Sequence, residues 1–112
     1  MASKVIVTKL FSVPPNTETY EPVYTVSPGA RFRLKKVKVH FPVGTASQLQ
    51  VRILQGWTSI APTSGNFTGD DVRFEHDVDA EYGSGSVVRA YIKNTSGAST
   101  KEFTVTIEGE ET

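Results

Sequence analysis

Hydrophobic and polar residues alternate along most of this 112-residue chain, a pattern typical of β-strands with one buried face. The clearest run lies near the end of the chain, where Phe103, Val105 and Ile107 share one parity. No segment has the 3.6-residue period of an amphipathic helix, and turns rich in Gly, Pro, Ser, Thr and Asn separate the runs. The pattern therefore predicts seven to eight short strands.

Strands of this number and spacing predict an all-β fold, namely an antiparallel two-sheet β-sandwich of jelly-roll or Greek-key topology. The length supports one domain over residues 1–112 with a single core. A closed barrel is the alternative. The alternation does not distinguish a jelly-roll strand order from an immunoglobulin-like one, because both folds have this spacing.

Residues 31–54 contain two alternating runs joined by a short connection, and we expect them to form a central hairpin. The inward positions of its two runs include Val37 and Phe41 in the first and Leu49 in the second. Within the first run the apolar residues occupy even positions up to Leu34 and odd positions from Val37. This change predicts a β-bulge or a strand that bends from one sheet to the other.

Three other segments carry specific expectations. Pro22 interrupts the run at residues 20–26, which predicts an edge strand or a bulge protected against uncontrolled pairing. Residues 58–69 are expected to be mostly loop. Residues 87–93 have apolar side chains at both odd and even positions, as in a strand at the centre of its sheet.

The bulk composition excludes several functions. The 12 basic and 12 acidic residues balance, which argues against nucleic acid as a partner. Without cysteine, the chain has no disulfide, thiolate zinc site or cysteine nucleophile. The first apolar stretch is too short for a signal peptide or a membrane span, so no membrane partner is expected.

Charged residues are concentrated in two runs. Residues 31–38 hold five of the 12 basic residues, and residues 70–81 hold six of the 12 acidic ones. The runs are interpreted either as solvated faces that pair weakly across neighbouring strands, or as faces through which neighbouring copies dock. On the second interpretation, the predicted interface residues are Arg31, Arg33, Lys35, Lys38, Asp71, Glu75, Asp77 and Asp79.

The sequence contains no recognisable catalytic or cofactor motif. The acidic run offers oxygen ligands for calcium, but it does not match a helix-loop-helix calcium loop. His40 and His76 have no second ligand at metal-binding spacing. No Gly-x-Ser-x-Gly elbow precedes a helix. We therefore expect no enzyme activity, no catalytic residue, no metal and no cofactor.

Aromatic residues suggest an alternative function of a different class. Trp57 follows Gly56 at a turn, and exposed aromatic rings stack against sugar faces. The tyrosines that could form an aromatic platform with it are Tyr20, Tyr24, Tyr82 and Tyr91. On this interpretation the protein is a carbohydrate-binding or adhesion module whose ligand-binding residues are Trp57 and Tyr82. The competing structural interpretation is that Trp57 caps the open end of the sandwich.

About half of the chain carries a family resemblance. A strand ending in Phe41-Pro42, the strand Val51-Arg52-Ile53 and the later run at residues 90–95 make it similar to small β-sandwich virion proteins of tailed phages and archaeal viruses. The resemblance implies a non-enzymatic capsid, decoration or fibre component, located in the virion. Such proteins act as homo-oligomers or within a larger assembly, and the resemblance supplies no binding residues.

Overall fold

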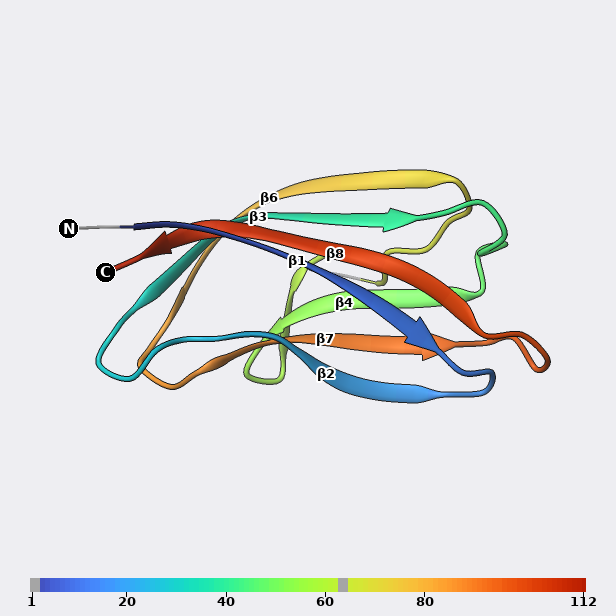
Figure 1. Ribbon diagram of the computed structural model, residues 1–112, viewed down its shortest axis with the longest axis horizontal. Helices are drawn as coiled ribbons and strands as arrows, with labels where there is room; N and C mark the ends of the chain where they lie inside the picture. The colour runs from blue at the N-terminus through green and yellow to red at the C-terminus, as the bar shows by residue number, and fades with distance from the viewer. Residues whose placement is uncertain (1–2, 63–64) are drawn as a thin grey trace.

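The computed structural model describes residues 3–62 and 65–112, which form eight β-strands (Figure 1). The strands are β1 (Ser3–Val13), β2 (Glu18–Thr25), β3 (Phe32–Phe41), β4 (Leu49–Gln55), β5 (Thr58–Ala61), β6 (Val72–Tyr82), β7 (Val87–Asn94) and β8 (Lys101–Glu111). Within these residues no helix is long and apolar enough to cross a membrane. The prediction of an all-β sandwich is confirmed.

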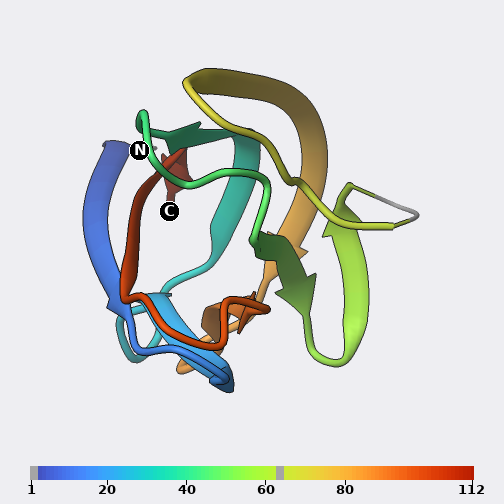
Figure 2. The ribbon, with the colours of Figure 1, turned by 90° about the vertical axis from the view of Figure 1, so that its right-hand side faces the viewer.

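The strands form two four-stranded antiparallel sheets that face each other, as the end-on view shows (Figure 2). Sheet A has the order β1-β8-β3-β6, and sheet B has the order β2-β7-β4-β5. The strand pairs are nested: β1 pairs with β8, β2 with β7, β3 with β6, and β4 with β5. This nesting is the jelly-roll topology.

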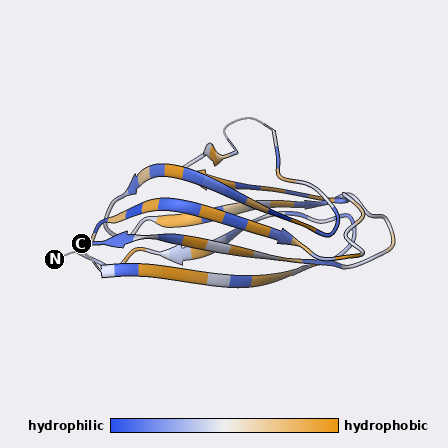
Figure 3. Ribbon diagram, turned by 90° about the horizontal axis from the view of Figure 1, so that it is seen from above, coloured by the Kyte–Doolittle hydropathy of each residue, from blue (hydrophilic) through white to orange (hydrophobic). Residues whose placement is uncertain are grey.

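The core lies between the sheets and follows the alternation in the sequence. Hydrophilic and hydrophobic residues alternate along the strands (Figure 3). The inward residues of β3, β4 and β8 have no exposed surface; among them are Phe32, Phe41, Leu49, Ile53 and Phe103. Strand β7 lies between β2 and β4, as expected for a central strand.

The predicted central hairpin is wrong. Strands β3 and β4 belong to different sheets, and the loop between them crosses from sheet A to sheet B. Phe41 and Leu49 are both fully buried, so each sheet directs its apolar residues into the shared core. Two strands that face each other across a sandwich show the same alternation as two paired strands, which explains the error.

The two predicted irregularities are confirmed. The register of β3 against both β6 and β8 shifts between Leu34 and Lys36, which is the bulge expected from the change of parity. Strand β2 is an edge strand of sheet B, and its register shifts between Pro22 and Tyr24. The segment predicted to be mostly loop, residues 58–69, includes the four-residue strand β5, which is too short for an alternation signal, and its residues 63–64 lie outside the described residues.

Candidate interaction surfaces

The outer face of sheet A carries a ladder of ion pairs centred on β3. Because β3 lies between β6 and β8, its outward lysines have acidic partners on both sides. Lys36 Nζ lies 2.8 Å from Glu75 Oε1, and Lys38 Nζ lies 2.9 Å from Glu108 Oε2. Lys36 lowers the pKa of Glu75 through a hydrogen bond and its charge, and Lys38 does the same for Glu108.

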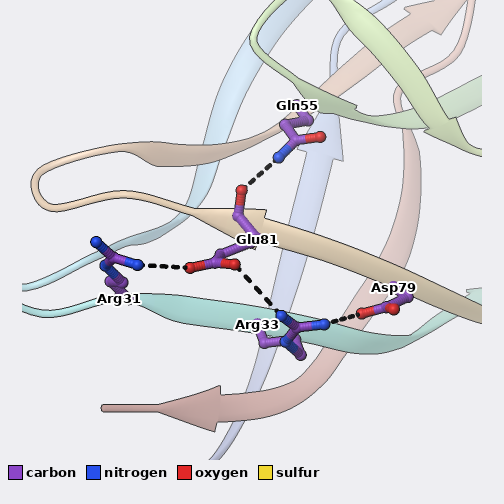
Figure 4. A network of polar contacts seen from close by, with 5 residues as sticks. All are labelled: Arg31, Arg33, Gln55, Asp79 and Glu81. Atoms are coloured by element: carbon purple, nitrogen blue, oxygen red, sulfur yellow. Dashed lines mark hydrogen bonds and ion pairs between the residues drawn. The ribbon is translucent and has the colours of Figure 1, made fainter.

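The ladder continues at the other end of β3 (Figure 4). Arg33 lies 2.8 Å from Asp79 and 3.3 Å from Glu81, and Arg31 lies 3.4 Å from the same Glu81. The Gln55 side chain of sheet B donates a hydrogen bond to the backbone oxygen of Glu81. The charged network is therefore linked to the second sheet.

The structure brings together seven of the eight residues predicted from the charged runs as an interface. Seven of them take part in ion pairs within the molecule; they are Arg31, Arg33, Lys35, Lys38, Glu75, Asp77 and Asp79. Asp77 is 88% exposed and lies 3.8 Å from Lys36, whereas Asp71 lies before β6 and outside the ladder. Glu108 and Glu110 of β8 also belong to the ladder and were not among the predicted residues, although they alternate on the last strand.

Asp70 stabilises a loop. Its Oδ1 accepts hydrogen bonds from the backbone N–H groups of Gly44 at 2.9 Å and Ala46 at 3.0 Å. These bonds, led by that of Ala46, lower the pKa of Asp70. Among the described residues no group of three or more His, Asp or Glu side chains is arranged to hold a metal ion. The acidic run is thus engaged in the loop and in the ladder.

A second exposed surface lies on the outer side of β1. Ile6 is 56% exposed and Leu10 is 62% exposed, and both point outward on the same face as the ladder. Between them, the Thr8 hydroxyl lies 3.0 Å from the Thr106 hydroxyl of β8. Two large apolar side chains exposed on one face of the same strand are a candidate contact surface.

The third surface is an aromatic cluster on the outer face of sheet B. The rings of Tyr20 and Trp57 meet edge to face with centroids 5.3 Å apart, and Tyr20 lies 5.3 Å from Tyr91. Arg89 and Arg52 lie over Trp57 and Tyr91, at 6.0 Å and 4.4 Å from the ring centroids. The guanidinium groups and rings therefore form one connected surface.

Trp57 itself is 77% exposed, so the interpretation in which it caps the sandwich is wrong. It sits on the β4–β5 turn, where Gly56 has a φ of 60°. Tyr82, predicted to act beside Trp57, instead points into the core and donates a hydrogen bond to the Leu54 backbone oxygen at 2.9 Å. Side chains alternate between the inward and outward faces along β6, and Tyr82 occupies an inward position.

Tyr91 is anchored at the base of the aromatic cluster. Its hydroxyl donates a hydrogen bond of 2.5 Å to the Glu18 carboxylate. Burial, together with this bond, raises the pKa of Tyr91 to about 12. The ring is therefore neutral and fixed at physiological pH, while Trp57 and Tyr20 keep exposed edges.

No protein-family model matches the sequence, and no curated protein matches it either. A chain of the cyanophage Pam1 capsid asymmetric unit is similar in structure, with a TM-score of 0.50 and 10% identity, covering 97% of this chain and 84% of that one. This likeness concerns the fold, and it confirms the resemblance of fold to β-sandwich proteins of phage virions.

Two further structures match with lower scores. A chain of the acidic stable capsid of Helicobacter pylori bacteriophage KHP30 has a TM-score of 0.49 and 20% identity, covering 100% of this chain and 98% of that one. The protein FLHE has a TM-score of 0.48 and 8% identity, covering 96% of each chain.

Proposed function

We propose that this protein is a non-enzymatic structural protein that acts by self-association or by joining a larger assembly, such as a capsid, its decoration or a fibre. The observation that carries the proposal is the exposure of Ile6 and Leu10 on one face of a regular strand. Solvent-exposed apolar pairs of this kind are suited to protein contacts. A chain of similar fold forms part of the cyanophage Pam1 capsid, which supports a location in the virion.

The charged residues of the outer face of sheet A are included in the proposed contact surface. The side chains of Asp77, Asp79 and Arg31 remain 88%, 73% and 73% exposed. A neighbouring copy can therefore approach these charges even though partners within the molecule already balance most of the ladder. Such contacts fix register and orientation more than they add affinity.

The solution mass of the untagged chain, measured by light scattering after size exclusion at low and high salt, tests the proposal. We expect a defined oligomer rather than the 12.2 kDa monomer. Dissociation at high salt indicates contacts through the ladder, and Arg33→Glu and Asp77→Lys should then weaken them. Persistence at high salt indicates the apolar surface of β1. A monomer under both conditions contradicts self-association.

A second candidate function is carbohydrate binding by the aromatic cluster. It is favoured by the exposure of Trp57 and by the edge-to-face contact with Tyr20, which holds the indole in a fixed orientation. A glycan that stacks on the indole should change the fluorescence of Trp57, the only tryptophan of the chain, with little dependence on salt. Trp57→Ala should abolish binding, while Val43→Ala, at an equally exposed position, should not.

A further inference from the structure

The four strand edges of the sandwich differ in their protection among the described residues. Strand β2 is interrupted at Pro22, and β5 has only four residues. Strand β6 has 11 residues, and the ring of Phe67 packs against two of its side chains, 5.3 Å from Phe74 and 5.9 Å from His76. Short strands, prolines and covering segments are the usual means of preventing edge pairing.

Strand β1 is long, uninterrupted and uncovered, and its protection is limited to the charges of Lys4 and Lys9. It pairs with β8 over all 11 residues, from Ser3 to Val13, without a shift of register. The end-on view shows β1 at the outer side of sheet A (Figure 2), and no described strand pairs with its other edge. The strand contains no proline, and its outward face presents Ile6 and Leu10.

We propose that β1 pairs antiparallel with β1 of a second copy, so that the two A sheets join into one continuous sheet. This inference rests on the proposed self-association and names its contact. Pairing over the whole strand places Ser3 opposite Val13 of the second copy and Thr8 on the two-fold axis. Because the interface is the same on both copies, it closes as a dimer and leaves no free β1 edge.

The full-length register is complementary in side chains. Ile6 lies opposite Leu10 of the second copy, so each dimer has two apolar cross-strand pairs on the outer face. Lys4 lies opposite Ser12, and Lys9 lies opposite Val7, so no two lysines are directly opposed. The two Lys9 residues are diagonal neighbours, and each donates a hydrogen bond to its own Pro22 backbone oxygen at 2.9 Å.

The length and chemistry of β1 favour a second copy over an unrelated partner. A strand of 11 residues is about 36 Å long, and the self-paired register uses this whole length. One apolar pair repeats on each side of the axis, which is the arrangement a two-fold interface requires. The charged ladder runs over β8, β3 and β6, so it does not include the free edge of β1.

Cysteine cross-linking tests the register directly, because the chain has no cysteine of its own. In the proposed dimer the Thr8 residues face each other at about 4.5–5.5 Å between Cα atoms, within the range for a disulfide. Thr8→Cys should therefore form a covalent dimer under mild oxidation. Val43→Cys, on the exposed β3–β4 loop, should remain monomeric in a denaturing gel. Equal cross-linking of the two variants overturns the proposal.

Charge variants provide a second test. Ile6→Lys/Leu10→Lys places like charges opposite each other and should raise the dimer Kd by about tenfold or more. Ile6→Glu/Leu10→Lys places opposite charges together in the same register and should keep the dimer. Both positions are exposed, so circular dichroism should show an unchanged fold. Equal dimerisation of the two variants overturns the register.

The outcomes separate this inference from the proposed function. An oligomer that persists in Ile6→Lys/Leu10→Lys, without cross-linking of Thr8→Cys, overturns β1 pairing and leaves assembly through another surface. A monomer in every experiment overturns both. A dimer that dissociates in the like-charge variant and forms the Thr8→Cys disulfide supports the pairing.

Discussion

Asn94 at the end of β7 ties three segments of the sandwich together. Its side chain is 1% exposed, and Nδ2 lies 3.0 to 3.1 Å from the backbone oxygens of Val13, Pro14 and Ser99. Its Oδ1 accepts a hydrogen bond from the Ser96 N–H at 2.9 Å. A buried amide that satisfies both donors and acceptors specifies the local structure more strictly than an apolar residue does.

Asn94→Asp should lower the free energy of unfolding at pH 7 by about 3 kcal/mol or more, because a buried carboxylate would face three carbonyl oxygens. Urea denaturation measures the loss, with Asn16→Asp at an exposed turn as control. The loss should shrink as the pH falls, since a protonated carboxyl can donate one hydrogen bond. An effect that does not depend on pH would contradict this explanation.

Gly109 on β8 is required for close packing against β3. A Cβ at this position would collide with the Arg33 backbone oxygen and come within 2.7 to 2.8 Å of the Phe32 ring. Gly109→Ala should therefore lower the free energy of unfolding by about 2–3 kcal/mol through overpacking. Gly97→Ala is the matched control, because no atom lies within 4 Å of its added Cβ. Equal melting temperatures for the two variants would refute the steric explanation.

At the scale of elements, β3 supplies sheet A with buried apolar side chains on its inner face and with cations on its outer face. Its bulge between Leu34 and Lys36 restores the inward direction of the apolar side chains on both sides of the shift. The outward positions then present cations between two acidic strands. Partners within the sheet neutralise these charges at exposed positions, so the ladder contributes modestly to stability.

The ladder predicts an acid-dependent loss of stability. The pKa values of Glu75 and Glu108 are lowered in the fold, so their contribution is present above the ordinary carboxyl pKa of about 4.3 and is lost as the pH falls through the folded values. Glu75→Gln/Glu108→Gln should therefore flatten the decline of the urea midpoint at acidic pH. Glu102→Gln, which removes no ion pair of the described residues, should leave the decline unchanged.

At the scale of the whole molecule, the nested strand order makes nearly all pairing non-local. Among the strands of the described residues, only β4 and β5 pair as neighbours across a tight turn, whereas β1 pairs with β8 at the other end of the chain. Each outer pair closes a longer loop than the pair inside it. The entropy of closing these loops must be overcome before the core packs.

Refolding should accordingly be slow for a domain of this size, with time constants of about milliseconds to seconds. Stopped-flow circular dichroism after dilution from urea measures the rate. A cross-link between β1 and β8, such as Thr8→Cys/Thr106→Cys formed at low protein concentration, should speed refolding, because it closes the longest loop in advance. Refolding in microseconds, or no effect of the cross-link, would contradict this account.

The sequence determined the properties that belong to single strands. Alternation such as that of Phe103, Val105 and Ile107 assigns inward and outward faces, and the change of parity before Val37 located the bulge. Pro22 likewise identified an edge strand, because proline lacks the N–H that a ladder needs. These signals are local, so they survive without knowledge of the neighbours.

Only the tertiary structure decided which strands and side chains meet. The charged runs were visible in the sequence, but the contribution of Glu108 depends on β8 lying beside β3, 70 residues away from Lys38 in the chain. Similarly, Tyr20 and Tyr91, rather than Tyr82, accompany Trp57 because β2 and β7 are adjacent. Jelly-roll and immunoglobulin-like strand orders share the same alternation. The pairing of strands that are distant in the sequence decides between them, and here it gives the jelly-roll order.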